Sequence, residues 1–275
     1  MPASHRSARS DQKAAPVKPK SARTYFLYGI HAVEAALCNP ARNHIQLMIG
    51  APEKHSLQTA YNLARQHGIK ISPVPQEWFA KTWPADTSHQ MIALETQPLH
   101  VHNGEDLLAN HDRILVFDHI NDPRNLGALM RSATAFGFTA IIQQKQGFVH
   151  ESPAMAKAAS GAIEHVQIAQ TINLARFLSL AKRHDFWCIG LDQQATAQVH
   201  NANWPKRIML VIGAEGKGLR PNLRSKLDMV LAICQSTEAV ASLNASVAGA
   251  IAMHAAYASQ QQPLQELIDA PSQIV

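Results

Sequence analysis

Arg131 ends the first segment of this sequence whose residue types could do chemistry. Asn125 and Gly127 precede it in the pattern Asn-x-Gly-x-x-x-Arg, which follows Asp122 and Pro123. Asn125 can cap a helix, and Pro123 and Gly127 set a tight entry to that helix. A guanidinium inside its first turns has two interpretations. It is either solvated at the protein surface or forms bidentate hydrogen bonds with a phosphate or a ribose.

A glycine-rich turn at residues 213–219 is the second such segment. Gly213, Gly216 and Gly218 permit positive φ and let a ligand approach the backbone closely. The turn lacks the Gly-Lys-Ser/Thr ending of a phosphate-binding loop, and Glu215 would repel phosphate. It also lacks the early glycine fingerprint of a dinucleotide site. Two interpretations remain, a flexible turn and a polar site for an uncharged or cationic ligand.

The third segment starts at Ser242 and continues as an alanine-rich helix. Ser242 and Asn244 are good helix N-caps, and capping alone could explain both. The helix after them contains Gly249 among its alanines. Such a surface packs very closely against another backbone, either within the chain or in a dimer.

The elements that must position these segments alternate between short apolar runs and amphipathic helices. Strands are predicted at residues 114–118, 140–143, 165–168, 187–191, 208–212 and 229–233, and helices at 126–136, 153–160, 174–184 and 243–259. This alternation predicts an α/β fold with a parallel sheet and helices on both faces. Ligands of such sheets bind in loops beyond the strand carboxyl ends. All three segments follow predicted strands, so we expect the site there.

A smaller α/β unit is predicted in front of this domain. Its helices are expected at residues 29–37, 57–67 and near 78, and its strands at 45–49, 70–74 and 91–95. The predicted boundaries are a tail at 1–24, a small domain at 25–96, a linker with one helical turn at 97–112, a large domain at 113–260 and a carboxyl-terminal tail at 261–275.

The net charge of +5 is concentrated at the amino terminus. Residues 1–24 hold six of the 25 basic side chains and one of the 20 acidic ones, which leaves 19 of each elsewhere. This Pro/Lys/Ser-rich segment has no hydrophobic period, and we expect it to be disordered. A basic arm can hold phosphates non-specifically, and it can equally be a solubilising terminus.

The remaining composition excludes several classes of protein. Cys38, Cys188 and Cys234 form no Cys-x-x-Cys pair, which argues against a zinc site or a disulfide framework and fits a reducing cytoplasm. There is no secretory signal pattern and no apolar run long enough to cross a bilayer. The sequence therefore predicts a cytoplasmic protein without a metal or a membrane anchor.

Taken together and in order, the three segments resemble the motifs of the SpoU family of RNA 2′-O-ribose methyltransferases. The resemblance is strong over residues 113–260. It extends to residues 28–35, which resemble the start of the family's small, ribosomal-protein-like substrate-binding domain. It implies a SPOUT-type α/β domain with a deep trefoil knot, an exception to the usual avoidance of threaded chains. It also implies a homodimer, S-adenosyl-L-methionine as cofactor and RNA as substrate, with 23S ribosomal RNA guanosine expected from the two-domain shape.

The resemblance also assigns site residues. The expected cofactor-binding residues are Gly213, Gly218, Ile233, Leu243 and Ala248. The expected catalytic residues are Asn125, Arg131, Glu215, Ser242 and Asn244. No metal ligand is expected among them.

The chemistry of methyl transfer fits an arginine in this set. A ribose 2′-hydroxyl is a poor nucleophile that loses its proton as it attacks, so the site must align two reactants and stabilise a developing alkoxide. Because a guanidinium is always protonated in proteins, we expect Arg131 to stabilise charge and to position the RNA rather than to act as a base. Glu215 and Asn244 would orient the cofactor or the loops by hydrogen bonds.

The sequence departs from the family pattern after Ile233. Members of this type usually carry Ile-Pro-Met there, whereas Cys234 and Gln235 follow here and the loop to Ser242 is slightly longer. This change leaves a second hypothesis, a non-catalytic RNA-binding relative that acts in ribosome assembly. A transfer RNA target is a third alternative. An ordinary Rossmann dehydrogenase is disfavoured by the missing glycine fingerprint.

Overall fold

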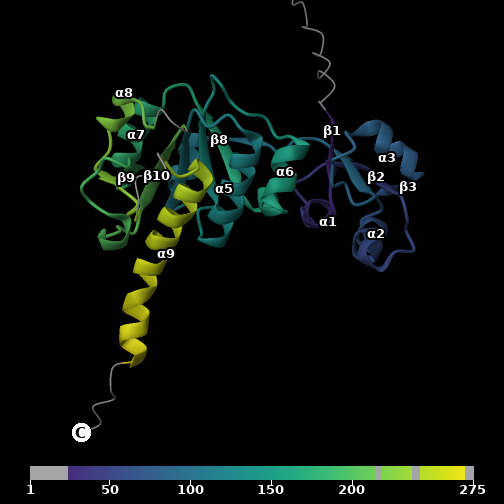
Figure 1. Cartoon of the computed structure of the whole chain (residues 1–275). Helices are drawn as coiled ribbons and strands as arrows, with labels where there is room; N and C mark the ends of the chain where they lie inside the picture. The colour runs from purple at the N-terminus through teal and green to yellow at the C-terminus, as the bar shows by residue number, and fades with distance from the viewer. Residues whose placement is uncertain (1–23, 215–217, 237–241, 270–275) are drawn as a thin grey trace, which may run out of the picture.

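Two separate β-sheets organise the chain, which we describe from a computed structural model covering residues 24–214, 218–236 and 242–269 (Figure 1). A four-stranded sheet forms the amino-terminal domain, and a seven-stranded sheet forms the larger domain. Helix α6 (Pro153–Ala159) lies between them and packs against the first strand of the small domain. The two α/β units predicted from the sequence are both present.

The small domain follows the predicted alternation with one additional strand. Its elements are β1 (Tyr25–Tyr28), α1 (Ile30–Cys38), β2 (His44–Ile49), the 3-10 turn η1 (His55–Leu57), α2 (Gln58–Gln66), β3 (Lys70–Pro73), α3 (Gln76–Thr82) and β4 (Ile92–Thr96). The strand order is β1-β4-β2-β3, with β2 and β3 parallel and the other pairs antiparallel. Strand β1 is not predicted because its four residues are all apolar or aromatic and show no alternation.

The segment predicted as a linker is more structured than expected. It contains β5 (Val101–Asn103) and α4 (Gly104–Asn110), where the sequence predicted a single helical turn. Strand β5 pairs in parallel with β8 and forms one edge of the large sheet. A three-residue strand has too short a hydrophobic pattern to be recognised, so β5 is not predicted, whereas α4 includes the predicted helical turn.

The large domain contains every strand and helix predicted for it. Its elements after α4 are β6 (Arg113–Asp118), α5 (Pro123–Ala135), β7 (Ala140–Gln144), α6, η2 (Ala162–His165), β8 (Gln167–Thr171), α7 (Leu174–Lys182), β9 (Trp187–Leu191), η3 (Val199–Asn201), β10 (Ile208–Gly213), α8 (Pro221–Arg224), β11 (Met229–Leu231) and α9 (Ala245–Asp269). Helix α8 is not predicted, and α9 continues past residue 259, where the sequence pattern ended.

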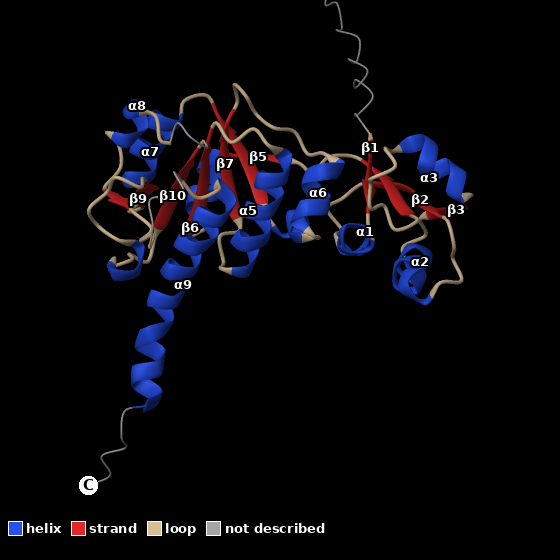
Figure 2. Ribbon diagram, viewed as in Figure 1, coloured by secondary structure: helices blue, strands red, loops and turns tan. Residues whose placement is uncertain are grey.

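The seven strands are all parallel, in the order β11-β9-β10-β6-β7-β8-β5 (Figure 2). Successive residues of β6 point to opposite faces, and Ile114, Leu115 and Val116 are all fully buried. Leu115 joins a core with α5, α6 and α9, whereas Ile114 and Val116 join a core with α4 and α7. Both faces are therefore covered, as the continuous apolar runs of a parallel sheet require.

Candidate active site

A cavity of about 300 Å³ opens at the carboxyl ends of β9, β10 and β11. It is lined by loop residues of these strands and by the start of α9, namely Leu191, Asp192, Gln193, Gln194, Ile212, Gly213, Ala214, Gly218, Leu219, Leu231, Ile233, Gln235, Ser242, Leu243, Ala245 and Ala248. The position agrees with the rule that parallel sheets bind ligands beyond their strand ends. Its size lies at the lower end of small-molecule sites.

The structure brings all five expected cofactor-binding residues to this one cavity. Gly213, Gly218, Ile233, Leu243 and Ala248 each line it, although they come from three separate segments of the chain. Their contact with a cofactor stays a prediction.

Close backbone packing explains Gly213, and a positive φ explains Gly218. A Cβ atom on Gly213 would lie 2.5 Å from the carbonyl carbon of Gly218, so a side chain does not fit there. Gly218 has a φ of +61° and donates its N–H to the carbonyl of Ala214 at 3.0 Å. Ala214 and Gly218 are thus paired, and both line the cavity. Glu215, an expected catalytic residue within this turn, lies outside the described residues.

The start of α9 is held by an asparagine. The Asn244 side-chain oxygen accepts hydrogen bonds from the Ser246 backbone N–H at 2.8 Å and from its hydroxyl at 2.6 Å. Asn244 therefore serves as the N-cap, as the sequence allowed. Ser242 lies before the helix and lines the cavity.

A direct hydrogen bond joins the first and third sequence segments. Asn244 donates through Nδ2 to Oδ1 of Asn125 at 3.1 Å. The suggestion that Asn125 caps α5 is wrong, because the cap is Asp122, whose carboxylate accepts from the Arg124 N–H at 2.9 Å. Asn125 instead directs its side chain toward α9, at the edge of the cavity.

Among the described catalytic candidates, Ser242 lines the cavity, whereas Asn125, Asn244 and Arg131 do not. Arg131 differs from the two asparagines because it makes no hydrogen bond to the described start of α9. It is exposed on α5. On the same helix, Gly127 lies against α6, where an added Cβ would be 2.3 Å from the Met155 carbonyl oxygen. Gly127 thus serves close helix packing and not a ligand.

An ion pair missed by the sequence analysis ties the glycine-rich turn to the sheet. Arg220 follows this turn, and its Nη2 lies 2.6 Å from Oδ1 of Asp118 at the end of β6. The Asp118 side chain is 1% exposed, and Arg220 also donates to the Gln144 side chain at 2.9 Å. The paired residues are about a hundred positions apart, so no local pattern could reveal them.

The loop after β9 is a second feature that the sequence analysis missed. Asp192, Gln193 and Gln194 line the cavity, and Asp192 forms an ion pair with Arg224 of α8. The strand before this loop was predicted, so its carboxyl end could have been recognised as a part of the site.

Neither a metal site nor a membrane span is found in the described part of the chain. Within residues 24–214, 218–236 and 242–269, no three His, Cys, Asp or Glu side chains are placed to share a metal ion. None of the helices in these ranges is long and apolar enough to cross a bilayer.

Known protein families match both domains of the chain. A family model described as the SpoU rRNA Methylase family matches residues 112–254, and one described as RNA 2′-O ribose methyltransferase substrate binding matches residues 26–101. The 23S rRNA (guanosine-2′-O-)-methyltransferase RlmB of Salmonella typhimurium is 32% identical over 83% of this chain and 96% of its own length. The RlmB of Pasteurella multocida is 34% identical over 82% of this chain and 95% of its own.

Two further matches widen the comparison. An uncharacterized tRNA/rRNA methyltransferase of Synechocystis is 31% identical over 83% of this chain and 61% of its own. The crystal structure of the SpoU methyltransferase AviRb from Streptomyces viridochromogenes, in complex with AdoMet, superimposes with a TM-score of 0.72. The superposition covers 86% of this chain and 90% of the AviRb chain, at 17% sequence identity. At this identity the similarity shows a shared fold only.

Proposed function

Because this chain belongs to the SpoU rRNA methylase family, we propose that it transfers a methyl group from S-adenosyl-L-methionine to a ribose 2′-hydroxyl of RNA. The observation that carries this function is the single cavity formed by all five residues expected to hold the cofactor. The family resemblance stated from the sequence is confirmed. The RNA target and the roles of individual residues are proposals that follow from it.

The cavity fits such a cofactor in chemistry as well as in position. Leu191, Ile212 and Leu243 offer apolar surface, and Asp192, Gln193 and Gln235 add polar groups to the lining. Ligand sites of this kind combine an apolar lining with a few polar groups that fix orientation. When bound, the cofactor supplies an electrophilic methyl group.

The protein must then align the ribose and stabilise the charge that develops on its oxygen. We assign the second task to Arg131, because a permanently charged fork can bind an alkoxide or a phosphate oxygen. The Asn125–Asn244 hydrogen bond holds the start of α9 against α5 at the edge of the cavity. Glu215 and Ser242 complete the proposed polar set.

A homodimer would explain the position of Arg131. On α9, Val247, Ile251 and Tyr257 are 47%, 37% and 37% exposed, which is unusual for large apolar side chains on one helix. Helix α5 packs beside α9, so a second copy bound to this surface would meet Arg131 as well. We propose that Arg131 of each copy serves the cavity of the other.

We further propose the trefoil knot of the family in this chain. Three loops from distant parts of the sequence line the one cavity, and the Val199 N–H donates to the Ala232 carbonyl at 3.0 Å beside it. Such crowding of loops supports a threaded path for the segment that leads into α9.

The proposed substrate is a guanosine of 23S ribosomal RNA, and the proposed location is therefore the cytoplasm. Similarity to the two RlmB enzymes over almost their whole length supports this target. Transfer RNA is the alternative substrate, because the similar Synechocystis protein is described as a tRNA/rRNA methyltransferase. The Cys234 loop, which motivated a non-catalytic alternative, includes residues 237–241 outside the described ranges, whereas Ile233 and Gln235 line the cavity.

Isotope transfer followed by mapping tests the function. Protein, cofactor with a labelled methyl group and total RNA lacking 2′-O-methylation are incubated, and the RNA is digested and analysed by mass spectrometry. We expect the label on a ribose, in 23S ribosomal RNA. Label on a base would refute the reaction. Absence of both methyl transfer and cofactor binding by calorimetry would support the non-catalytic alternative, because a degenerate site should give no heat.

A further inference from the structure

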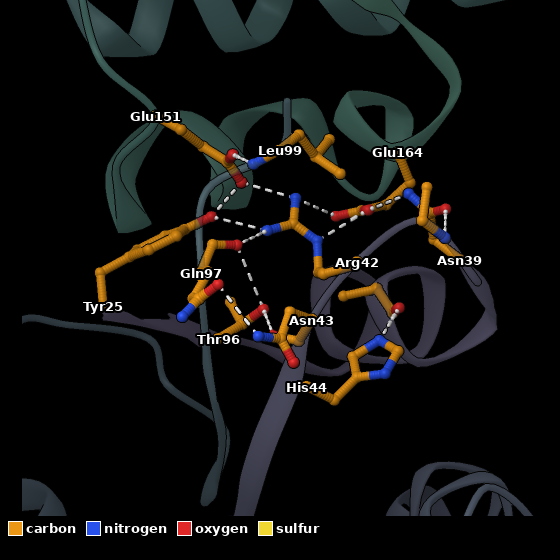
Figure 3. A network of polar contacts seen from close by, with 12 residues as sticks. Tyr25, Asn39, Arg42, Asn43, His44, Thr96, Gln97, Leu99, Glu151 and Glu164 are labelled. Atoms are coloured by element: carbon orange, nitrogen blue, oxygen red, sulfur yellow. Dashed lines mark hydrogen bonds and ion pairs between the residues drawn. The ribbon is translucent and has the colours of Figure 1, made fainter. Parts of the chain in front are cut away.

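A fully buried arginine joins the two domains (Figure 3). Arg42 lies between α1 and β2 of the small domain, and its side chain is 0% exposed. Its Nη2 is 2.6 Å from a carboxylate oxygen of Glu151 and 2.8 Å from one of Glu164. Both glutamates belong to the large domain, Glu151 just before α6 and Glu164 in η2. The ion pairs therefore cross the domain boundary.

Four hydrogen bonds hold this guanidinium. Nε donates to Glu164 at 2.8 Å, and Nη1 donates to the Tyr25 hydroxyl at 3.1 Å and to the Gln97 carbonyl at 3.0 Å. Nη2 donates to Glu151 at 2.6 Å, and its contact with Glu164 is an ion pair. A planar fork held in this way fixes direction as well as distance.

The same two carboxylates also hold the connection between the domains. Glu151 accepts the Leu99 backbone N–H at 2.9 Å, and Tyr25 donates its hydroxyl to this carboxylate as well. Glu164 accepts from the Asn39 side chain at 2.8 Å. Burial alone would lower the pKa of Arg42, but the hydrogen bond that it donates to Glu164 and the charges of both glutamates outweigh burial and raise this pKa. Arg42 is thus a cation between two buried acids.

Apolar packing surrounds the network and extends across the boundary. Gly161, between α6 and η2, has a φ of +91°, and a Cβ on it would be 2.7 Å from Cβ of Ala35 on α1. Ala36 of α1 and Ala159 of α6 are fully buried in one common core. The domains therefore meet through a specific interface and not only through their connecting segment.

The rim of this interface faces the start of α5. Lys157 of α6 donates to the Gln90 side chain of the small domain at 2.9 Å. Arg124, exposed next to Asn125, is close enough to Tyr28 of β1 for its charge to oppose the rise that burial causes in the pKa of Tyr28. Basic side chains of the large domain thus stand beside the small domain near the catalytic loops, where an RNA backbone would be attracted.

We propose that Arg42 is a positioning residue for the RNA substrate: by bridging Glu151 and Glu164 it fixes the orientation of the small domain, so that RNA held there meets the catalytic loops. This inference rests on the proposed function. A domain held in one orientation presents bound RNA without a further loss of conformational entropy. Precise placement matters because misplacement of a reacting group by about 1 Å can lower the rate by about 100-fold.

The test compares Arg42→Met with Arg207→Met. Methionine keeps much of the length of arginine but leaves Glu151 and Glu164 to repel each other. Arg207 is the matched control, because it binds Asp112 and three backbone carbonyls entirely within the large domain. Small-angle X-ray scattering, cofactor affinity by calorimetry, and kcat and KM on an unmodified 23S ribosomal RNA transcript are measured for each.

For Arg42→Met we expect a larger radius of gyration and a KM for the RNA raised about tenfold or more. Cofactor Kd should stay within about twofold, because the cavity lies outside this interface. Arg207→Met should change neither the scattering nor the KM. The inference is overturned if Arg42→Met scatters like the wild type, or if its KM rises no more than that of the control.

A triple variant keeps the test decisive if Arg42→Met fails to fold. Arg42→Met, Glu151→Met and Glu164→Met together remove all three charges, and buried triads of this kind can be replaced by apolar residues without loss of the fold. We expect the KM of the triple variant to return toward the wild-type value only if its radius of gyration returns as well. A KM that recovers while the radius of gyration stays larger would overturn the inference. Wild type that shows no methyl transfer would refute the proposed function, and the scattering would still decide the role of Arg42.

Discussion

At the scale of single residues, Arg131 carries the proposed chemistry without touching the cavity of its own chain. Its assignment comes from the family motif, and its exposure on α5 is consistent with service to an RNA strand or to a second subunit. Asn125 and Asn244, by contrast, are already joined by their hydrogen bond. The proposed catalytic set thus contains Ser242 in the cavity lining, two asparagines that join α5 to the start of α9, and an arginine that must reach the sugar.

Replacing Arg131 by alanine should lower kcat by about 100-fold or more, since a missing oxyanion donor typically costs that much. Cofactor Kd should change less than twofold, because Arg131 lies outside the cavity lining. Methyl transfer at saturating RNA and calorimetry measure the two effects. Arg183→Ala, which removes an exposed arginine after α7, is the control. Undiminished transfer by Arg131→Ala would refute the assignment.

Cys188 gives a prediction on the pH dependence of stability. Burial, together with the Asp228 carboxylate, raises the pKa of this thiol to about 12. An unfolded thiol ionises near pH ~8.5. Above this pH the unfolded state therefore loses a proton that the folded state keeps, and the free energy of unfolding falls by up to about 1.4 kcal/mol per pH unit.

Urea unfolding between pH 7 and 10.5 measures this effect. The stability of Cys188→Ala should fall less steeply with pH than that of the wild type, whereas Cys38→Ala, at an exposed position, should follow the wild type. Parallel curves for the wild type and Cys188→Ala would contradict the expected burial of the thiol.

At the scale of elements, hydrophobic periodicity predicted the helices and strands of the parallel sheet well. Continuous apolar runs such as that of β6 and amphipathic helices such as α5 are long enough to be recognised. Strands β1 and β5 were missed, because one lacks alternation and the other has three residues.

Only the parts of the site that lie in sequence motifs could be predicted. The glycines, the start of α9 and their convergence followed from strand ends and family resemblance, and the cavity brings them together. The Asp118–Arg220 pair and the Arg42 network could not be predicted. Each joins residues that are distant in the sequence, and an ion pair between distant segments leaves no periodic signal.

The Asp118–Arg220 pair should anchor the glycine-rich turn to β6. Arg220→Met leaves a buried carboxylate without its cation, which we expect to cost about 1–3 kcal/mol, toward the lower end because the Arg220 side chain is 34% exposed. The turn would also lose its anchor, so cofactor Kd should rise several-fold. Chemical unfolding and calorimetry measure the two effects.

A double variant separates the two effects. Asp118→Asn combined with Arg220→Met removes the buried charge, so stability should recover in part while cofactor Kd stays raised. If Kd returns to the wild-type value with stability, Arg220 has no separate role in placing the turn.

At the scale of the whole molecule, the proposed catalytic site is not complete within one chain. A long helix, α9, extends from the large domain (Figure 1). Its side chains Val247, Ile251 and Tyr257 are exposed, and Arg131 does not line the cavity. The Arg42 network fixes one domain against the other within a chain. The dimer proposed above would fix one chain against another. The Arg42 network and the dimer would therefore both help to align a large RNA with a small cavity.

Charged substitutions on α9 should therefore separate the subunits. Val247→Glu combined with Ile251→Glu places two carboxylates one helical turn apart on the exposed apolar face. We expect a monomer in sedimentation velocity and loss of methyl transfer with the fold retained. Gln261→Glu, which adds a charge to an exposed polar position of the same helix, should leave both unchanged.

Mixing two inactive variants tests whether Arg131 acts across the subunit boundary. Arg131→Ala keeps an intact cavity, and Ala248→Phe obstructs the cavity while keeping Arg131. In a mixed dimer, an arginine that acts on the other subunit restores one complete site, whereas an arginine that acts within its own chain restores none. We expect mixing to recover about a quarter of wild-type transfer, because random exchange makes half of the dimers mixed and each holds one of two sites. Activity that stays at the level of the separate variants, with subunit exchange verified by differently tagged chains, would show that each chain completes its own site.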